Sequence, residues 1–283
     1  MSNQRTVELG RLSWAEVAEA MPRRPIILLP IGTVEQHGPH LPVNADNMVA
    51  SYVALRAAEQ TNALVAPNIN YGNSAVFAAF PGTIHVRPET LANVVRDVCQ
   101  SLIAQGFRRI IFVDNHGGNE AVCEQVAREL KAEHGVVIGN IYPWGLGYQL
   151  MRDTYDDVAA AYGHGAEPET SAMLGMYPED VVAARRESGT VQPFAGWNPS
   201  AYSKVEIPGQ AAPGTVYLDS DELTANGVTG DGSVATPERG QVWIERVVGF
   251  AVAFIDHYDT VTRDAAWATK PPSRHLVGVK SAP

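Results

Sequence analysis

The chain contains 283 residues, of which 45% are hydrophobic and 18% charged, and its formal net charge is -10. This composition is typical of a globular protein rather than a disordered one. An acidic chain without a Lys- or Arg-rich run is poorly suited to nucleic acid or to an anionic membrane, so we expect neither as a partner. Residues 1–12 contain no basic stretch followed by an apolar one, so we expect no signal peptide. Cys99 and Cys123 fall in predicted helices, so we expect both to be reduced in a cytoplasmic protein.

Blocks of apolar residues predict strands and helices in turn along the chain. A capping box at Ser13–Glu16 opens a short first helix, and Thr236-Pro237 opens the last one. Short apolar runs predict strands at 25–31, 63–66, 109–114 and 136–142. Helical spacing or helix-start signals predict helices at 46–59, 89–104, 120–133, 169–176 and from 237 onward. This alternation is typical of an α/β fold with a parallel or mostly parallel sheet and helices on both faces.

No linker or internal repeat divides the chain, so we predict one catalytic domain over residues 1–283. From about 184 to 240 the periodicity disappears, and Gly, Pro, Ser, Asn and Thr dominate. A long irregular stretch inside a compact domain is usually functional or interfacial.

Polar clusters follow the predicted strands, at the strand ends where parallel sheets place their binding sites. Glu35 and His37 come just after the first strand, and Asp46 opens the next helix. Carboxylate oxygens and imidazole nitrogens are ligands for Zn²⁺, Mn²⁺ or Fe²⁺. Alternatively, Asp46 serves only as a helix cap and the histidine is a solvated loop residue.

Two further clusters follow the same pattern. Asn115-His116-Gly117-Gly118-Asn119 follows the most apolar strand, and its paired glycines let the backbone approach a ligand. The segment 163–171 brings His164, Glu167 and Glu169 to a helix start, which suits general acid–base chemistry beside a metal. The plainer interpretations are a glycine turn with a surface histidine and a pair of helix-dipole partners.

Five ordered motifs are similar to those of the creatininase family and together span roughly residues 10–258. They are G-T-V-E-Q-H-G-P-H-L-P-V-N-A-D at 32–46, F-P-G-T-I-H-V at 80–86, N-H-G-G-N at 115–119, G-H-G-A-E-P-E-T-S at 163–171 and G-V-T-G-D-G-S-V-A-T at 227–236. The resemblance implies a three-layer α/β/α fold, a homohexamer and two divalent metal ions per subunit.

Carried over by position, the resemblance implies roles for individual residues. Glu35 and His116 would bind one metal, His37 would bind the other, and Asp46 would bridge them. His164 would act as a proton shuttle. The motif leaves open which of two glutamates is the fifth ligand; we assign Glu169 to the metals and Glu167 to catalysis.

Four more residues are predicted to contact the substrate: Tyr142, Trp144, Asn119 and Ser74. For the two aromatic residues, plain packing is an equally good interpretation. The sequence also departs from the family pattern, because Gly118 stands where creatininase itself has a metal-binding glutamate, which argues against creatinine as the substrate. Ala75, Val76 and Phe77 replace the region where many relatives carry a histidine, so we expect a more apolar wall there.

The sequence therefore predicts a metal-dependent amidohydrolase that uses a metal-activated water to cut a non-peptide C–N bond in a small cyclic amide, formamide or related amide. One alternative is a metal- or small-molecule-binding protein that lacks catalysis. Another is a dinuclear phosphoesterase, which is less well supported because the three clusters contain no Arg or Lys to hold a phosphate.

Overall fold

The computed structural model describes residues 5–273 and 276–278. Its helices of the α type are α1 (Trp14–Ala20), α2 (Ala45–Ala58), α3 (Pro88–Gln105), α4 (Glu120–His134), α5 (Pro143–Leu150), α6 (Val158–Ala161), α7 (Glu169–Met176), α8 (Ser220–Leu223) and α9 (Pro237–Thr262). Its strands are β1 (Ile26–Ile31), β2 (Ala63–Val65), β3 (Ile110–Asp114), β4 (Gly139–Ile141), β5 (Pro199–Ala201) and β6 (Lys204–Val205). Short 3-10 turns include η3 (Ala75–Phe77) and η4 (Gly117–Asn119).

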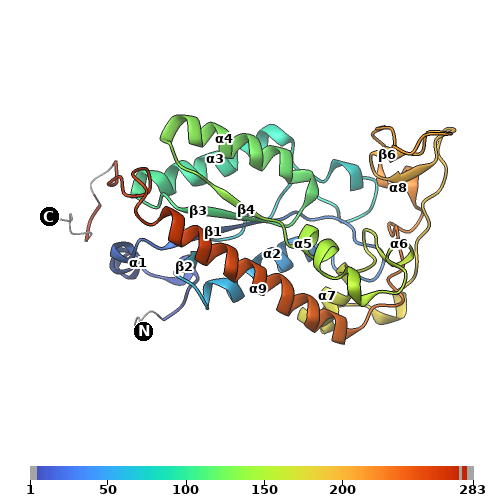
Figure 1. The fold of residues 1–283 in the computed structure, drawn as a ribbon, viewed down its shortest axis with the longest axis horizontal. Coiled ribbons are helices and arrows are strands. Elements are labelled where there is room, and N and C mark those ends of the chain that lie inside the picture. The colour runs from blue at the N-terminus through green and yellow to red at the C-terminus, as the bar shows by residue number, and fades with distance from the viewer. Residues whose placement is uncertain (1–4, 274–275, 279–283) are drawn as a thin grey trace.

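The centre of the fold is a four-stranded sheet in the order β2-β1-β3-β4, and every pair in it is parallel. Helices α3 and α4 cover one face, while α2, α5 and α9 lie on the other (Figure 1). Successive side chains of a strand point to opposite faces of the sheet, so the strands contribute to two separate cores. Ile27, Leu29 and Ile110 pack toward α3 and α4, whereas Leu28 and Ile111 pack toward α2 and α9. The predicted three-layer α/β/α fold is confirmed.

Most predicted elements lie within one or two residues of the observed ones, including the capping box in which Ser13 and Glu16 bond reciprocally. The exception is the strand predicted at 136–142, because only Gly139–Ile141 pair with β3. Val136 instead packs into the core under α3 and α4. An edge strand has one neighbour, so its length is set by that pairing and not by its apolar run.

The region from 184 to 240 contains the antiparallel β5–β6 pair, the one-turn α8, the end of a 3-10 turn at Ala183–Arg185 and, from Pro237, the first turn of α9, and it is otherwise irregular. Val205, Leu218 and Leu223 form a small core of their own there, joined by partly buried neighbours such as Val191 and Tyr202. The β5–β6 pair and α8 lie together at one end of the molecule, beyond α5 (Figure 1). Among the described residues, no helix is both long and apolar enough to cross a bilayer.

Candidate metal centre

The site forms where β1 and β3 end side by side. Glu35 and His37 follow β1, His116 follows β3, and Asp46 lies in the first turn of α2. All four residues are at most 6% exposed. The chain leaving β1 packs directly on the start of α2, because a Cβ added at Gly32 would lie 2.4 Å from Asn47 Oδ1. This close packing is what allows Asp46, eleven positions after Glu35, to join the strand-end residues.

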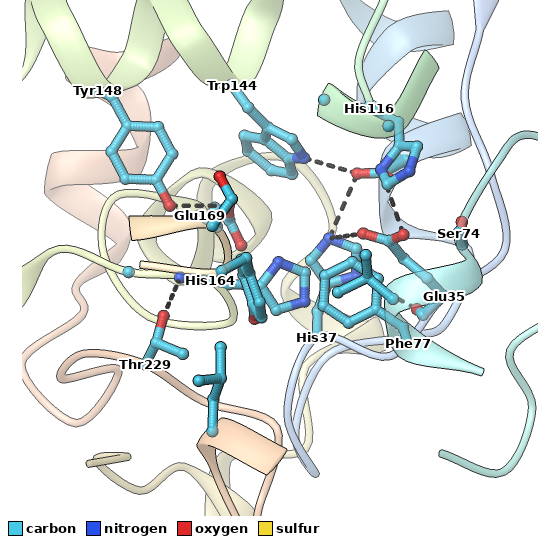
Figure 2. A pocket seen from close by; sticks show the side chains of 18 of the residues that line it. Glu35, His37, Ser74, Phe77, His116, Trp144, Tyr148, His164, Glu169 and Thr229 are labelled. Carbon is cyan, nitrogen blue, oxygen red and sulfur yellow. Dashed lines mark hydrogen bonds and ion pairs between the residues drawn. The ribbon is translucent and has the colours of Figure 1, made fainter. Parts of the chain in front are cut away.

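The four side chains converge on one another (Figure 2). Nε2 of His37 lies 3.3 Å from Oδ1 of Asp46 and 3.8 Å from Oε1 of Glu35. Nδ1 of His116 lies 3.2 Å from Oε2 of Glu35 and 3.3 Å from Oδ2 of Asp46. Asp46 therefore faces both histidines, one with each oxygen.

Backbone carbonyls orient both imidazole rings. Nδ1 of His37 is 3.3 Å from the carbonyl oxygen of Glu35, and Nε2 of His116 is 2.9 Å from that of Asn73. If these nitrogens carry the protons, the opposite nitrogens present lone pairs to the carboxylate cluster. Such outer hydrogen bonds fix the tautomer of a metal-binding histidine.

The electrostatics of the cluster favour a bound cation. Burial raises the pKa of Glu35. Burial alone would lower the pKa of His37, but the carboxylate of Asp46 outweighs it and raises the value to about 9. The pKa of His116 is also raised against the effect of burial, chiefly by Glu35. The carboxylates thus attract positive charge to the space between the histidines.

The donor set fits divalent metal ions by two independent observations. Glu35 Oε2 and Asp46 Oδ2 are buried and, although each lies within 3.3 Å of His116 Nδ1, neither accepts a hydrogen bond of good geometry from the described residues, whereas buried carboxylate oxygens normally do. In the described part of the chain, potential ligand atoms form two groups, and within each group the atoms lie within 4.8 Å of one another. One group is Glu35, Asp46 and His116, and the other is Glu35, His37 and His164. Imidazole and carboxylate ligands suit zinc, manganese and iron.

His164 lies beside the cluster, with its ring stacked between those of His37 and Phe77. The ring centroids are 4.5 Å from His37 and 4.3 Å from Phe77. Nε2 of His164 lies 2.7 Å from the carbonyl oxygen of Gln36, and the backbone N–H of His164 donates to Thr229 Oγ1 at 2.9 Å. Burial, with the neighbouring His37, holds the pKa of His164 well below its usual range, so the ring is neutral near pH 7.

The two glutamates of the third motif occupy different places. Glu169 lines the cavity beside the cluster, and its carboxylate accepts hydrogen bonds from Tyr148 Oη at 3.0 Å and from the Gly165 backbone N–H at 2.8 Å. Glu167 is fully buried and accepts from Tyr155 Oη at 2.7 Å and from Ser171 Oγ at 2.8 Å. Glu167 is not among the residues that line the cavity.

A cavity of about 550 Å³ opens onto the cluster. Of the four residues that the sequence predicts as substrate contacts, Ser74, Tyr142 and Trp144 line this cavity, whereas Asn119 does not. Trp144 also donates from Nε1 to Asp46 Oδ1 at 2.7 Å, so it holds a carboxylate as well as forming a wall. Figure 2 labels Ser74 and Trp144 and marks the hydrogen bond from the Trp144 indole with a dashed line.

Asn119 lies behind the site and ties three loops together. Its side chain donates to the carbonyl of Gly32 at 3.2 Å and to Asp114 Oδ1 at 3.1 Å, and it accepts from the backbone N–H of Asn73 at 2.9 Å. Because the carbonyl of Asn73 in turn contacts His116, Asn119 positions a member of the cluster and does not face the cavity.

Several cavity residues had no predicted role. Tyr148 lies one helical turn after Trp144 in α5, and this i, i+4 spacing is a signal for a shared face. Thr229 lines the cavity and falls within the motif at 227–236, so its signal is the motif itself. Val191, Tyr202 and Leu223 come from the irregular region, where no periodicity indicates which side chains turn inward.

Comparison with known proteins agrees with this architecture. The sequence profile described as "Creatininase: Creatinine amidohydrolase" matches residues 10–255. A mycofactocin precursor peptide peptidase of Mycolicibacterium smegmatis is 32% identical over 235 residues, which cover 80% of this chain and 83% of that protein. A solved structure described as "Creatininase Mn" superposes with a TM-score of 0.70 at 27% identity, covering 90% of this chain and 99% of the other. A mutant creatininase of the Zn-Zn type gives the same TM-score, identity and coverage.

Proposed function

The chain belongs to the creatininase family of hydrolases, and from this premise we propose that it is a metal-dependent amidohydrolase that cleaves an amide C–N bond. One observation carries the proposal. Glu35, His37, Asp46 and His116 converge from separate segments, leave two buried carboxylate oxygens without a hydrogen bond, and border a cavity large enough for an organic substrate.

In this proposal the residues divide between two divalent ions. Glu35 and His116 would hold one, His37 and Glu169 would hold the other, and Asp46 would serve both. Zinc or manganese fits this set, as in the solved relatives, and so does iron. When bound, such ions lower the pKa of water toward about 7 and polarise a carbonyl oxygen.

The remaining chemistry belongs to the protein's own side chains. His164 is neutral, and if Nε2–H donates to the Gln36 carbonyl, Nδ1 is free to accept a proton. It then passes this proton to the leaving nitrogen, which must be protonated before it departs. Stacking between His37 and Phe77 limits rotation of the ring, and Tyr148 with the Gly165 N–H fixes the Glu169 carboxylate.

Our candidate substrates are small cyclic amides, formamides and related amides. Creatinine is disfavoured because Gly118 lines the cavity where creatininase has a glutamate. A Cβ at Gly118 would lie 2.2 Å from the Asn73 carbonyl oxygen and 2.4 Å from His116 Nε2, so this backbone leaves no room for that side chain. The site must therefore bind its second ion through other residues.

A peptide bond is the second candidate. It is favoured by the relative named as a precursor peptide peptidase and by a cavity of about 550 Å³, which exceeds the needs of a bare ring amide. A phosphoesterase is less well supported, since no Lys or Arg is found among the described residues that line the cavity. We also propose a homo-oligomer, a hexamer by family resemblance, which light scattering would test.

The decisive experiment measures hydrolysis of a panel of cyclic amides, formamides and short peptides with and without added Mn²⁺, Zn²⁺ or Fe²⁺. We expect turnover of at least one class that requires metal and is lost in Asp46→Ala. Asp256→Ala, which removes an exposed aspartate on α9, is the matched control and should retain full activity. Equal rates in the stripped protein, the loaded protein and Asp46→Ala would refute the proposal. A metal-loaded protein that turns over nothing would indicate the binding protein without catalysis.

A further inference from the structure

We propose that the outer part of the cavity selects substrates whose amide carries an uncharged, apolar substituent, an inference that rests on the proposed hydrolase function. The cavity has two unlike ends. Its ionisable side chains gather at the metal centre, whereas the irregular region from 184 to 240 supplies much of the opposite wall.

The outer wall carries no charged side chain, and its apolar part, which lies beside the hydroxyls of Ser200 and Ser203, is pre-formed. Val191, Tyr202 and Leu223 line the cavity and also pack together in the small separate core of the irregular region. The ring of Tyr202 meets Phe77 edge-on at 5.2 Å and His164 edge-on at 5.8 Å. Because these side chains are held by their own core, the wall presents a fixed apolar surface directly above the reacting groups.

The charges around the cavity argue against a charged substituent. The carboxylates that line it, Glu35, Asp46 and Glu169, are at most 3% exposed and lie at the metal centre. Among the described lining residues there is no Lys or Arg, so no side chain at the outer end can form an ion pair with an anion, and the serine hydroxyls there are neutral. A cation would also lack a partner there, and burying an unpaired charge is costly. The chain's net charge of -10 further opposes the approach of anions.

The size of the cavity requires a substituent of some kind. A volume of about 550 Å³ lies within the range of roughly 300–1,000 Å³ that encloses a drug-sized ligand. A formamide or a five-membered ring at the metals would leave the space beside Val191 and Leu223 empty. An aryl or alkyl group would fill it and would gain from the removal of apolar surface from water.

Three hydroxamates test the inference by binding rather than turnover. The hydroxamate group anchors each ligand at the metals, and the para-ethyl, para-carboxylate and para-aminomethyl derivatives of phenylacetohydroxamate carry outer groups of similar size that differ in charge. We expect the manganese-loaded protein to bind the neutral ligand at least about tenfold more tightly than either charged one by calorimetry.

Two variants, one in the turn between β5 and β6 and one in β5 beside that turn, make the test specific. Ser203 lines the cavity and is only half-buried, so Ser203→Arg places a cation at the outer end without altering a core. It should improve binding of the para-carboxylate at least about tenfold and weaken the aminomethyl ligand. Ser200→Arg, at a more exposed lining position, should act in the same direction. Ser101→Arg, on the exposed surface of α3, is the matched control and should change nothing.

The outcomes separate the two proposals. Equal affinity of the wild type for all three ligands, or an unchanged preference in both folded Ser203→Arg and folded Ser200→Arg, would overturn the inference even if the amide panel shows turnover. Binding that follows the expected order supports it even if none of the tested amides is cleaved. If no hydroxamate binds in a metal-dependent manner, the metal centre itself is wrong and the inference fails with it.

Discussion

Replacing Trp144 with phenylalanine should weaken metal binding through a residue that is not itself proposed as a ligand. The indole Nε1 donates to Asp46 Oδ1 at 2.7 Å in a site where Trp144 is only 3% exposed. A hydrogen bond to a buried charged group contributes about 1.5–3 kcal/mol, which corresponds to about 10- to 150-fold in a binding constant. Only the part of this energy that differs between the metal-free and metal-loaded states affects affinity. We therefore expect Trp144→Phe to weaken Mn²⁺ binding by about 10- to 100-fold.

The assay is competition for Mn²⁺ against a chromophoric chelator, with Trp243→Phe as the matched control. Trp243 is fully buried and packs edge-on against Trp144 at 5.7 Å, but its Nε1 has no hydrogen-bond partner among the described residues. The control therefore loses similar packing and no hydrogen bond. Unchanged or tighter metal binding in Trp144→Phe, or an equal loss in both variants, would show that the indole does not position Asp46.

Three further variants test other contacts. Gly118→Ala should force His116 to move, because the added Cβ would lie 2.4 Å from its Nε2. We expect it to lower both the metal affinity and the free energy of unfolding, the latter by about 1–3 kcal/mol. A fully stable variant with normal metal content would contradict this close packing. Glu167→Gln leaves Tyr155 or Ser171 without its acceptor, so it should lower the free energy of unfolding in urea by about 1–3 kcal/mol. We expect kcat/KM to stay within a few-fold of the wild type. Lost turnover at normal stability would instead indicate that Glu167 is catalytic. Burial raises the pKa of Glu169 from 4.5 to about 7, so in the metal-free protein the folded state holds this proton more tightly than the unfolded chain does. The protonated carboxyl therefore contributes stability that is complete below about pH 4.5 and is lost as the pH rises through about 7. Across that window, the free energy of unfolding in urea should fall for the wild type relative to Glu169→Gln. A difference between the two proteins that stays constant with pH would contradict the burial of this carboxyl.

The layers of the fold were accessible from the sequence because their signals are local. The apolar run at β3 and the spacing of Leu91, Val95 and Leu102 in α3 each specify an element without knowledge of its neighbours. The length of β4 was not accessible, since it depends on how far β3 extends beside it.

The same distinction applies to the site. Glu35, His37 and His116 follow two strands that are neighbours in a parallel sheet, and the strand-end rule alone brings them together. The roles of Glu167 and Glu169 could not be separated in this way. They are two residues apart. What distinguishes them is that the Tyr155 hydroxyl donates to Glu167 in the interior, while the Tyr148 hydroxyl donates to Glu169 at the cavity. Such contacts between distant segments leave no periodic trace in the sequence.

The most direct test of the metal centre is the number of ions bound per chain, measured by elemental analysis after loading with Mn²⁺ and removal of the excess. The assignment predicts two ions per chain for the wild type and no more than one for either His37→Ala or His116→Ala, because each histidine serves a different ion. A folded wild type that retains none, or single variants that both still retain two, would contradict it.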